Sequence, residues 1–170
     1  GEKVEFKLWY QQAQDANDAL KTNDEAFGVG VFLPNEKLNA KLGLTQIGEQ
    51  FRPGLGFVNR TGIKQWDGWI SVSNPLKKGQ VKDLYHTVYF EHVENLSGQR
   101  LSRFVSTDLL EARTQSNLSF RLGFDHFIEH IETPFTLIEN WTIPAADHRF
   151  SHWRANAETD HSQDVFVSAT

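Results

Sequence analysis

The segment from His126 to His130 contains the side chains whose types and spacing come closest to a catalytic pattern. It reads His-Phe-Ile-Glu-His, and an H-x-x-E-H segment on a helix places two histidines one turn apart, where they bind zinc. Here the segment continues a run in which apolar and polar residues alternate, so a β-strand is expected. On a strand His126 and His130 lie ~13 Å apart, too far to bind one zinc ion. We therefore predict that this segment binds no metal ion.

Carboxyl groups for acid–base catalysis are present but form no recognisable motif. Glycoside hydrolysis requires two of them about 5–9.5 Å apart on either side of a sugar. The candidates are Asp125, Glu129, Glu132 and Glu139, and nothing in the sequence places two of them across a cleft. The chain has no cysteine, which excludes thiolate metal sites and a cysteine nucleophile. Phosphate-binding and dinucleotide motifs are also missing, so we expect no cofactor and no catalysis in this segment.

The composition narrows the class of protein and its partners. The chain of 170 residues has 17 basic and 22 acidic residues and a formal net charge of −5. No long basic run is present to contact phosphates, so we expect no nucleic-acid partner. The length suits one domain, taken as residues 1–170. The apolar runs are only a few residues long, whereas a membrane-spanning helix needs ~20 apolar residues.

Alternation of apolar with polar residues recurs along the chain and predicts strands, because successive side chains of a strand point to opposite faces. It is clearest in residues 118–125, where Leu and Phe alternate with small or polar residues. Residues 15–21 offer the single helical interpretation, but their polar composition suits a loop better. We predict an all-β, antiparallel up-and-down meander of about nine strands. The other alternating or extended runs lie within residues 4–11, 26–33, 38–45, 65–72, 84–91, 100–112, 148–157 and 164–170.

The predicted connections alternate between long and short. Long connections are expected at residues 12–24, 48–60 and 127–147, short ones at 33–37, 74–79 and 113–116, and an intermediate one at 95–98. This asymmetry is typical of outer-membrane β-barrels, whose strands of ~10 residues alternate apolar outward and polar inward. A soluble β-sandwich also alternates. Alternation alone therefore leaves both architectures open.

The loop after the third predicted strand has the composition of an ordered loop. Pro53 and the neighbouring glycines favour turns, the phenylalanines and Leu55 supply apolar area, and Arg60 can pair with a carboxylate. We interpret it as a structural plug or brace that folds onto or into the mouth of a barrel. A ligand-binding role is the alternative.

This loop also carries a resemblance to a known family. Residues 51–63 read Phe-x-Pro-x-Leu-Gly-Phe-Val-x-Arg-Thr-Gly-Ile, which resembles a signature of an uncharacterised bacterial outer-membrane β-barrel domain family. A second patch, residues 133–135 with 142–150, is similar to that family's Ile-Pro-Ala-Gly-Asp-Tyr-Arg segment, except for Ala146 in place of glycine and His148 in place of tyrosine. The matching positions, which we interpret as structural, are Phe51, Pro53, Leu55, Gly56, Phe57, Val58, Arg60, Thr61, Gly62, Pro134, Phe135, Ile143, Pro144, Asp147 and Arg149.

The resemblance implies a transmembrane β-barrel of which this chain is an incomplete part. Family members carry the barrel domain C-terminal to a module like family-nine carbohydrate-binding domains, so that module and further strands are expected to be missing here. The implied location is the bacterial outer membrane, with lipid as a partner and passage or capture of a solute such as a glycan as the function. The alternative is a soluble all-β domain that binds carbohydrate or another small ligand, and glycoside hydrolysis is a weaker third option.

Overall fold

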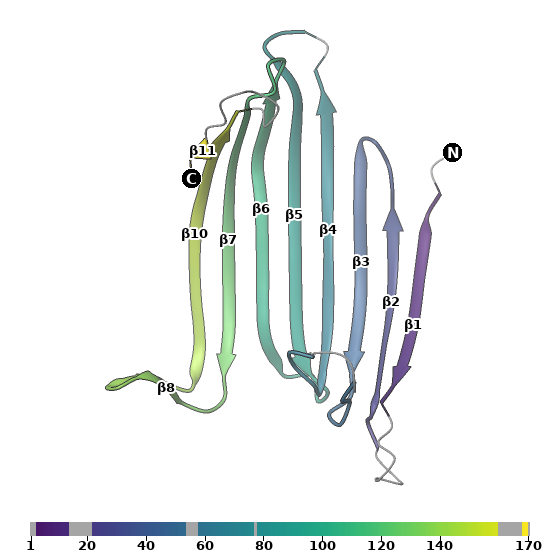
Figure 1. Ribbon diagram of the computed structural model, residues 1–170, viewed down its shortest axis with the longest axis vertical. Coiled ribbons are helices and arrows are strands. Elements are labelled where there is room, and N and C mark those ends of the chain that lie inside the picture. Colours follow the sequence, from purple (N-terminus) through teal and green to yellow (C-terminus); the bar gives the residue numbers. More distant parts are fainter. Residues whose placement is uncertain (1–2, 14–21, 54–57, 77, 160–167, 170) are drawn as a thin grey trace.

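The computed structural model describes residues 3–13, 22–53, 58–76, 78–159 and 168–169 (Figure 1). They form strands joined by turns, and none belongs to a helix long and apolar enough to cross a bilayer. The strands are β1 (Glu5–Gln12), β2 (Glu25–Leu33), β3 (Leu38–Ile47), β4 (Ile63–Pro75), β5 (Val81–Asn95), β6 (Arg100–Thr114), β7 (Ser119–Ile131), β8 (Phe135–Ile138), β9 (Trp141–Ile143), β10 (Ala146–Glu158) and β11 (Ser168–Ala169).

Nine of these strands form one antiparallel sheet in the order β1-β2-β3-β4-β5-β6-β7-β10-β11. Eight of the nine are long, whereas β11 has two residues. The order follows the sequence except that β8 and β9 pair with each other in a separate hairpin. The all-β up-and-down meander predicted from the sequence is confirmed. Within the described ranges β1 and β11 are the outer strands and no ladder joins them, so the sheet is open.

The connections divide between the two ends of the sheet as the sequence predicts (Figure 1). Those before β2, before β4 and between β7 and β10 are long, and the strand ends that they join lie at the lower end in the figure, together with the short β5–β6 turn. The turns after β2, β4 and β6 are short and lie at the upper end. The prediction is wrong about the last long connection, because β7 continues through Ile131 and the connection contains the β8–β9 hairpin. A turn at Asn140, with φ of 72°, closes this hairpin.

Asparagine side chains build two of the short turns. The Asn35 carboxamide oxygen accepts hydrogen bonds from the backbone N–H groups of Lys37 (2.8 Å) and Leu38 (3.2 Å). The Asn95 oxygen accepts in the same way from Ser97 (3.1 Å) and Gln99 (2.9 Å). Such bonds satisfy backbone donors where the ladder is interrupted, which is why asparagine is common in turns.

The register gives the sheet two chemically different faces. On the apolar face Phe6 lies opposite Val31, which lies opposite Leu42, and the face continues through Leu8, Val29, Leu44, Trp66, Ile70, Val72, Val88, Phe90, Val105, Leu110, Leu122, Phe124 and Trp153. The polar face carries Lys41, Gln65, Asp67, Ser71, Thr87, Tyr89, Glu91, Ser102, Phe104, Ser106, Asp108, Glu111, Arg121, Asp125, Phe127, Glu129, Phe150, His152 and Arg154.

Little of this sheet is covered by other parts of the described chain. Among the residues that the structure describes, the apolar side chains below a tenth exposure are Ala26, Phe51, Ile63, Val93 and Ala112, and no large side chain is fully buried. Four of these five lie in or beside the strand ends where the long connections gather. A second sheet that packs against the first, as in a β-sandwich, is not among the described residues.

Gly48 shows how tightly the chain packs where β3 ends. Its N–H donates to the carbonyl oxygen of Glu25 (2.8 Å), and a Cβ added to it would lie 2.1 Å from the Asn23 carbonyl oxygen. We predict that Gly48→Ala lowers the free energy of unfolding by about 1–3 kcal/mol, because backbone must move to make room. Gly30→Ala is the control, since its Cβ would have only one ordinary contact, 3.7 Å from the Leu42 carbonyl oxygen, and should change stability by less than about 0.5 kcal/mol. Urea unfolding followed by tryptophan fluorescence tests this, and equal losses would contradict it.

Candidate functional site

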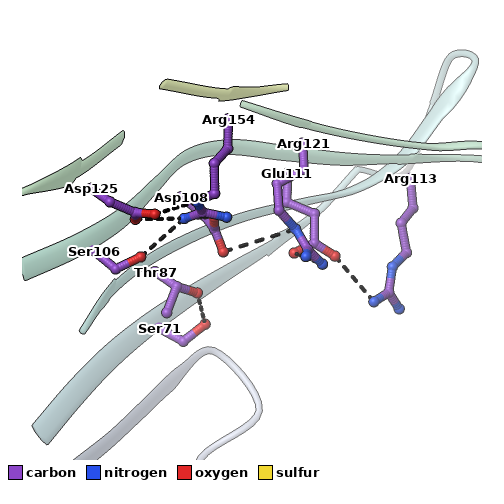
Figure 2. Close-up of polar contacts among 9 residues, drawn as sticks. All are labelled: Ser71, Thr87, Ser106, Asp108, Glu111, Arg113, Arg121, Asp125 and Arg154. Carbon is purple, nitrogen blue, oxygen red and sulfur yellow. Dashed lines mark hydrogen bonds and ion pairs between the residues drawn. The ribbon is translucent and has the colours of Figure 1, made fainter. Parts of the chain in front are cut away.

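Arg154 of β10 is the centre of a hydrogen-bonded cluster on the polar face (Figure 2). Its Nε and Nη2 atoms donate to the two carboxylate oxygens of Asp125 in β7 (2.8 and 3.0 Å). Nη2 also donates to Ser106 Oγ (3.0 Å) and Asp108 Oδ1 (3.2 Å) in β6. The Asp125 side chain is 7% exposed. The two bonds to the Asp125 carboxylate join β10 to β7, and the bonds to Ser106 and Asp108 join β10 to β6, so one guanidinium holds three strands in register.

The cluster continues toward the end of the sheet that carries the short turns. Arg121 lies 3.9 Å from Asp108 and 3.2 Å from Glu111, and Arg113 pairs with the same Glu111 (3.1 Å). Figure 2 shows this row of alternating charges and, beside it, the hydroxyl pair of Ser71 and Thr87. We call the whole set the charge ladder. Opposite charges on neighbouring strands make this face polar without leaving any of these carboxylates unpaired.

Gly123 has no side chain, and the centre of the charge ladder occupies the space that a side chain would fill there. It lies in β7 between Asp108 and Arg154 in the register. A Cβ at this position would lie 2.8 Å from the Arg154 guanidinium and 3.0 Å from the Asp108 carboxylate. The absence of a side chain here is therefore what lets Arg154 reach Asp108 across an intervening strand.

A cleft lies on the polar face at the end with the long connections. It has a volume of about 580 Å³ and is lined by Ile47, Val58, Asn59, Arg60, Ile63, Gln65, Glu91, Val93, Ser102 and Glu129. Arg60 of the β3–β4 loop reaches Glu129 of β7 (2.6 Å), so the expected pairing of this arginine with a carboxylate is present. Glu91 accepts hydrogen bonds from Gln65 (3.0 Å) and Tyr89 (3.3 Å). The loop thus forms one wall of the cleft.

Four aromatic side chains cross the polar face between this cleft and the charge ladder. Tyr89, Phe104, Phe127 and Phe150 come from β5, β6, β7 and β10, and we call them the aromatic ladder. The ring centroids are 5.6 Å apart for the first pair, 4.4 Å for the second and 4.7 Å for the third. The last two pairs are stacked, with interplanar angles of 24° and 11°. His152 extends the group, 5.8 Å from Phe127.

The histidines of the H-x-x-E-H segment lie on a strand, as predicted. The structure places His126 and His130 in β7, where each bonds to β10: His126 Nδ1 to Ser151 Oγ (2.7 Å) and His130 Nδ1 to Asp147 Oδ1 (2.9 Å). Among the residues that the structure describes, no three histidine or acidic side chains converge on a point where a metal ion would fit.

The four acidic candidates for hydrolysis do not gather at one site. Asp125 is engaged by Arg154 and Glu129 by Arg60. Glu132 follows β7, and Glu139 lies in the β8–β9 turn. Glu91, which the sequence analysis does not single out, shares the cleft with Glu129.

The two sequence patches that carry the family resemblance lie at the same end of the sheet, where the long connections gather (Figure 1). In the first patch Phe51 is buried, with 4% exposure, and Gly62 has a φ of 69°. Pro53 and Thr61 lie in the β3–β4 loop, together with Val58 and Arg60, which line the cleft. Leu55, Gly56 and Phe57 fall outside the described residues.

The second patch forms the β8–β9 hairpin and the start of β10. Phe135 and Ile143 pair across the hairpin, Pro134 precedes it and Pro144 follows it. Asp147 bonds to Arg100 and His130 and lies 3.8 Å from Arg149. The two departures from the family segment are accommodated here. Ala146 starts β10 and is not among the described non-glycine residues with positive φ, and His148 Nε2 bonds to the Pro144 carbonyl oxygen (2.9 Å).

No family model matches the chain, and neither a curated protein nor a solved structure matches it. The resemblance drawn from residues 51–63 therefore stays a prediction.

Arg154→Leu should destabilise the sheet far more than the loss of a more exposed arginine. The substitution leaves Asp125 and Asp108 without their shared cation, and the Asp125 side chain is only 7% exposed. We therefore expect the free energy of unfolding to fall by about 2–3 kcal/mol, near the lower limit for the loss of one partner of a buried ion pair. The control is Arg113→Leu, whose side chain is 53% exposed and which should cost less than about 1 kcal/mol. Urea unfolding of both variants and of Arg154→Lys measures these free energies. If Arg154→Leu is as stable as the unmodified protein, the charge ladder does not stabilise the sheet.

Proposed function

We propose that the chain is a segment of a bacterial outer-membrane β-barrel protein for the passage or capture of a solute such as a glycan. In this proposal the apolar face of the sheet contacts lipid and the polar face lines the interior. Strands of a barrel satisfy every backbone donor and acceptor between neighbours, which is the condition for crossing hydrocarbon. The proposal does not include catalysis in this segment.

The observation that carries the proposal is that large apolar side chains on one face of the sheet are exposed. Leu8 is 81% exposed, Phe6 78%, Trp153 65% and Leu42 50%, whereas Asp125 of the polar face is 5% exposed. In a soluble sheet the order is reversed, because burial of apolar area stabilises the fold in water. Apart from the hydrogen-bonded pair of His126 and Ser151 opposite Val105, the central part of this face is largely apolar. Such a face needs an apolar neighbour, and lipid supplies one without a second protein layer.

The lengths of the strands agree with this placement. A membrane-spanning strand needs ~9–11 residues, and β4 to β7 have 13, 15, 15 and 13 residues. They can cross the hydrocarbon and extend beyond it. The long connections at one end and short turns at the other are the arrangement expected of outer-membrane barrels.

The apolar face also ends where a membrane boundary would require it. In the register Trp66 lies opposite His92, which lies opposite Arg103, and Arg149 lies opposite Ile128 on the same face. These charged or polar side chains are near the end with the long connections. Tryptophan and basic residues favour the interface between hydrocarbon and headgroups, so this row fits the edge of an apolar belt.

Fractionation of the cells that make the protein, followed by a gel run with and without boiling, tests the proposal. We expect recovery in the outer membrane and a change of mobility on boiling. Recovery in the soluble fraction would overturn the membrane assignment and favour the soluble carbohydrate-binding domain instead.

Substitutions on the two faces of β3 sharpen the test. Leu42→Arg introduces a charge on the apolar face, and at mid-strand depth this should disfavour insertion by about 2–4 kcal/mol, so little of the variant should reach the membrane. Thr45→Arg, on the polar face of the same strand, is the matched control and should insert as the unmodified protein does. In a soluble protein Leu42, at 50% exposure, should tolerate arginine with a change below about 0.5 kcal/mol.

A further inference from the structure

We propose that an anionic phospholipid binds to the apolar face across β6, β7 and β10, with its phosphate on Arg103 and Arg149 and an acyl chain in a groove nearer the other end of these strands. This inference deepens the proposed outer-membrane placement and rests on it. The placement by itself requires only hydrocarbon, whereas the inference names the class of lipid and the side chains that bind it.

The two arginines lie on the same face and in one row of the sheet. Arg103 of β6 lies opposite Ile128 of β7, which lies opposite Arg149 of β10. Their backbones are therefore two strand spacings apart, about 10 Å. Both residues are exposed, and their side chains are long enough to reach one anionic group that lies over Ile128. Arginine suits this role because its planar fork binds phosphate oxygens in pairs.

No carboxylate of the described chain neutralises this row closely. Arg103 has no hydrogen bond or ion pair to another described residue. Arg149 is 3.8 Å from Asp147, but the two oxygens of that carboxylate already bond to Arg100 and to His130. A phosphate over this row would therefore meet two cations that lack a bonded acidic partner.

The other carboxylates near this end of the three strands are placed elsewhere. Glu129 lines the cleft on the polar face and pairs there with Arg60. Glu94 of β5 lies 3.7 Å from His92. Glu132 follows β7 and forms no ion pair with a described residue. The positive charge of the row is therefore available to an anion from outside the chain.

A groove on the apolar face crosses the same three strands nearer their other end. It has a volume of about 360 Å³, and its lining includes Leu110 of β6, Leu122 of β7 and Ala155 of β10. Leu122 precedes Ile128 by six residues, which is about 20 Å along the strand. At the strand tilt of barrels, ~35–45°, this is a depth of about 15 Å, half of the ~30 Å hydrocarbon core. An acyl chain of one leaflet can therefore reach from the arginine row to the groove.

Apolar side chains line most of the path between the arginines and the groove. Phe124 and Trp153 have ring centroids 5.0 Å apart, and Trp153 is 65% exposed. The path also includes His126 and Ser151, whose imidazole Nδ1 and hydroxyl bond to each other (2.7 Å). Cations, apolar side chains and an apolar groove thus follow one another along the strands. A phospholipid has its parts in this order, whereas a free phosphate ion matches only the cations.

Native mass spectrometry of the purified full chain in dodecyl maltoside tests the proposal, with dipalmitoyl phosphatidic acid as the probe. We expect this lipid to bind more tightly than dipalmitoyl phosphatidylcholine, because the choline group cancels the charge of the phosphate. Arg103→Gln and Arg149→Gln should each weaken the binding of phosphatidic acid about fivefold, the effect of one arginine at a membrane surface. Ala155→Leu should weaken the binding of both lipids, because it fills the groove.

Arg113→Gln is the matched control. Arg113 is an exposed arginine of β6 like Arg103, but it pairs with Glu111 on the polar face. We expect this variant to bind phosphatidic acid as the unmodified protein does, and all these variants to unfold at an unchanged urea concentration. Equal losses for Arg113→Gln and Arg103→Gln, or equal binding of the two lipids, would overturn the proposal. Inorganic phosphate that binds as tightly as phosphatidic acid would identify a site for the free anion and would also overturn it.

The two proposals fail separately in these experiments. A membrane-bound protein that binds the two lipids equally keeps the barrel and overturns the phosphate site. A soluble protein that binds phosphatidic acid through Arg103 and Arg149 keeps the phosphate site and overturns the barrel.

Discussion

Each long strand of this protein hydrogen-bonds to its neighbours in a fixed antiparallel register, and a slip by one residue would move all of its side chains to the other face. The charge ladder shows what depends on this. Arg154, Asp125 and Ser106 meet because β10, β7 and β6 pair in one register. An irregularity between Asp108 and Leu110 inserts an extra residue in β6, so that Asp108 and Glu111, three positions apart, both lie on the polar face. Bulges of this kind redirect side chains without ending the strand.

Because the sheet is a single layer, we expect contacts between neighbouring strands to carry much of its stability. A sheet with few buried apolar side chains gains little from a core, so pairs between neighbouring strands become the main source of specificity. On one face these pairs are ionic and converge on Arg154; farther along the same face they are aromatic and converge on Phe127. Gly123 and Gly48 lie where an added side chain would clash with its neighbours. At Gly123 the neighbour is the Arg154 guanidinium, and at Gly48 it is backbone.

The two faces then require different surroundings, and this connects the fold with the proposed function. Apolar side chains such as Leu8 and Leu42 are exposed on one face, while paired charges crowd the other. A bilayer on one side and an aqueous interior on the other satisfy both at once. The β3–β4 loop, through Arg60, forms one wall of the cleft on the polar face.

The sequence by itself determined the strands, the difference in connection lengths and the strand conformation of the H-x-x-E-H segment, because alternation with a period of two is a local property. It also indicated that Arg60 would pair with a carboxylate, although not that the partner would be Glu129. Only the tertiary structure decided the extra residue in β6, the β8–β9 hairpin, and the meeting of Phe104, Phe127 and Phe150. These three residues are separated by 23 positions in each step of the chain. Their contact follows from the hydrogen-bond register between strands, which no local pattern of residue types specifies.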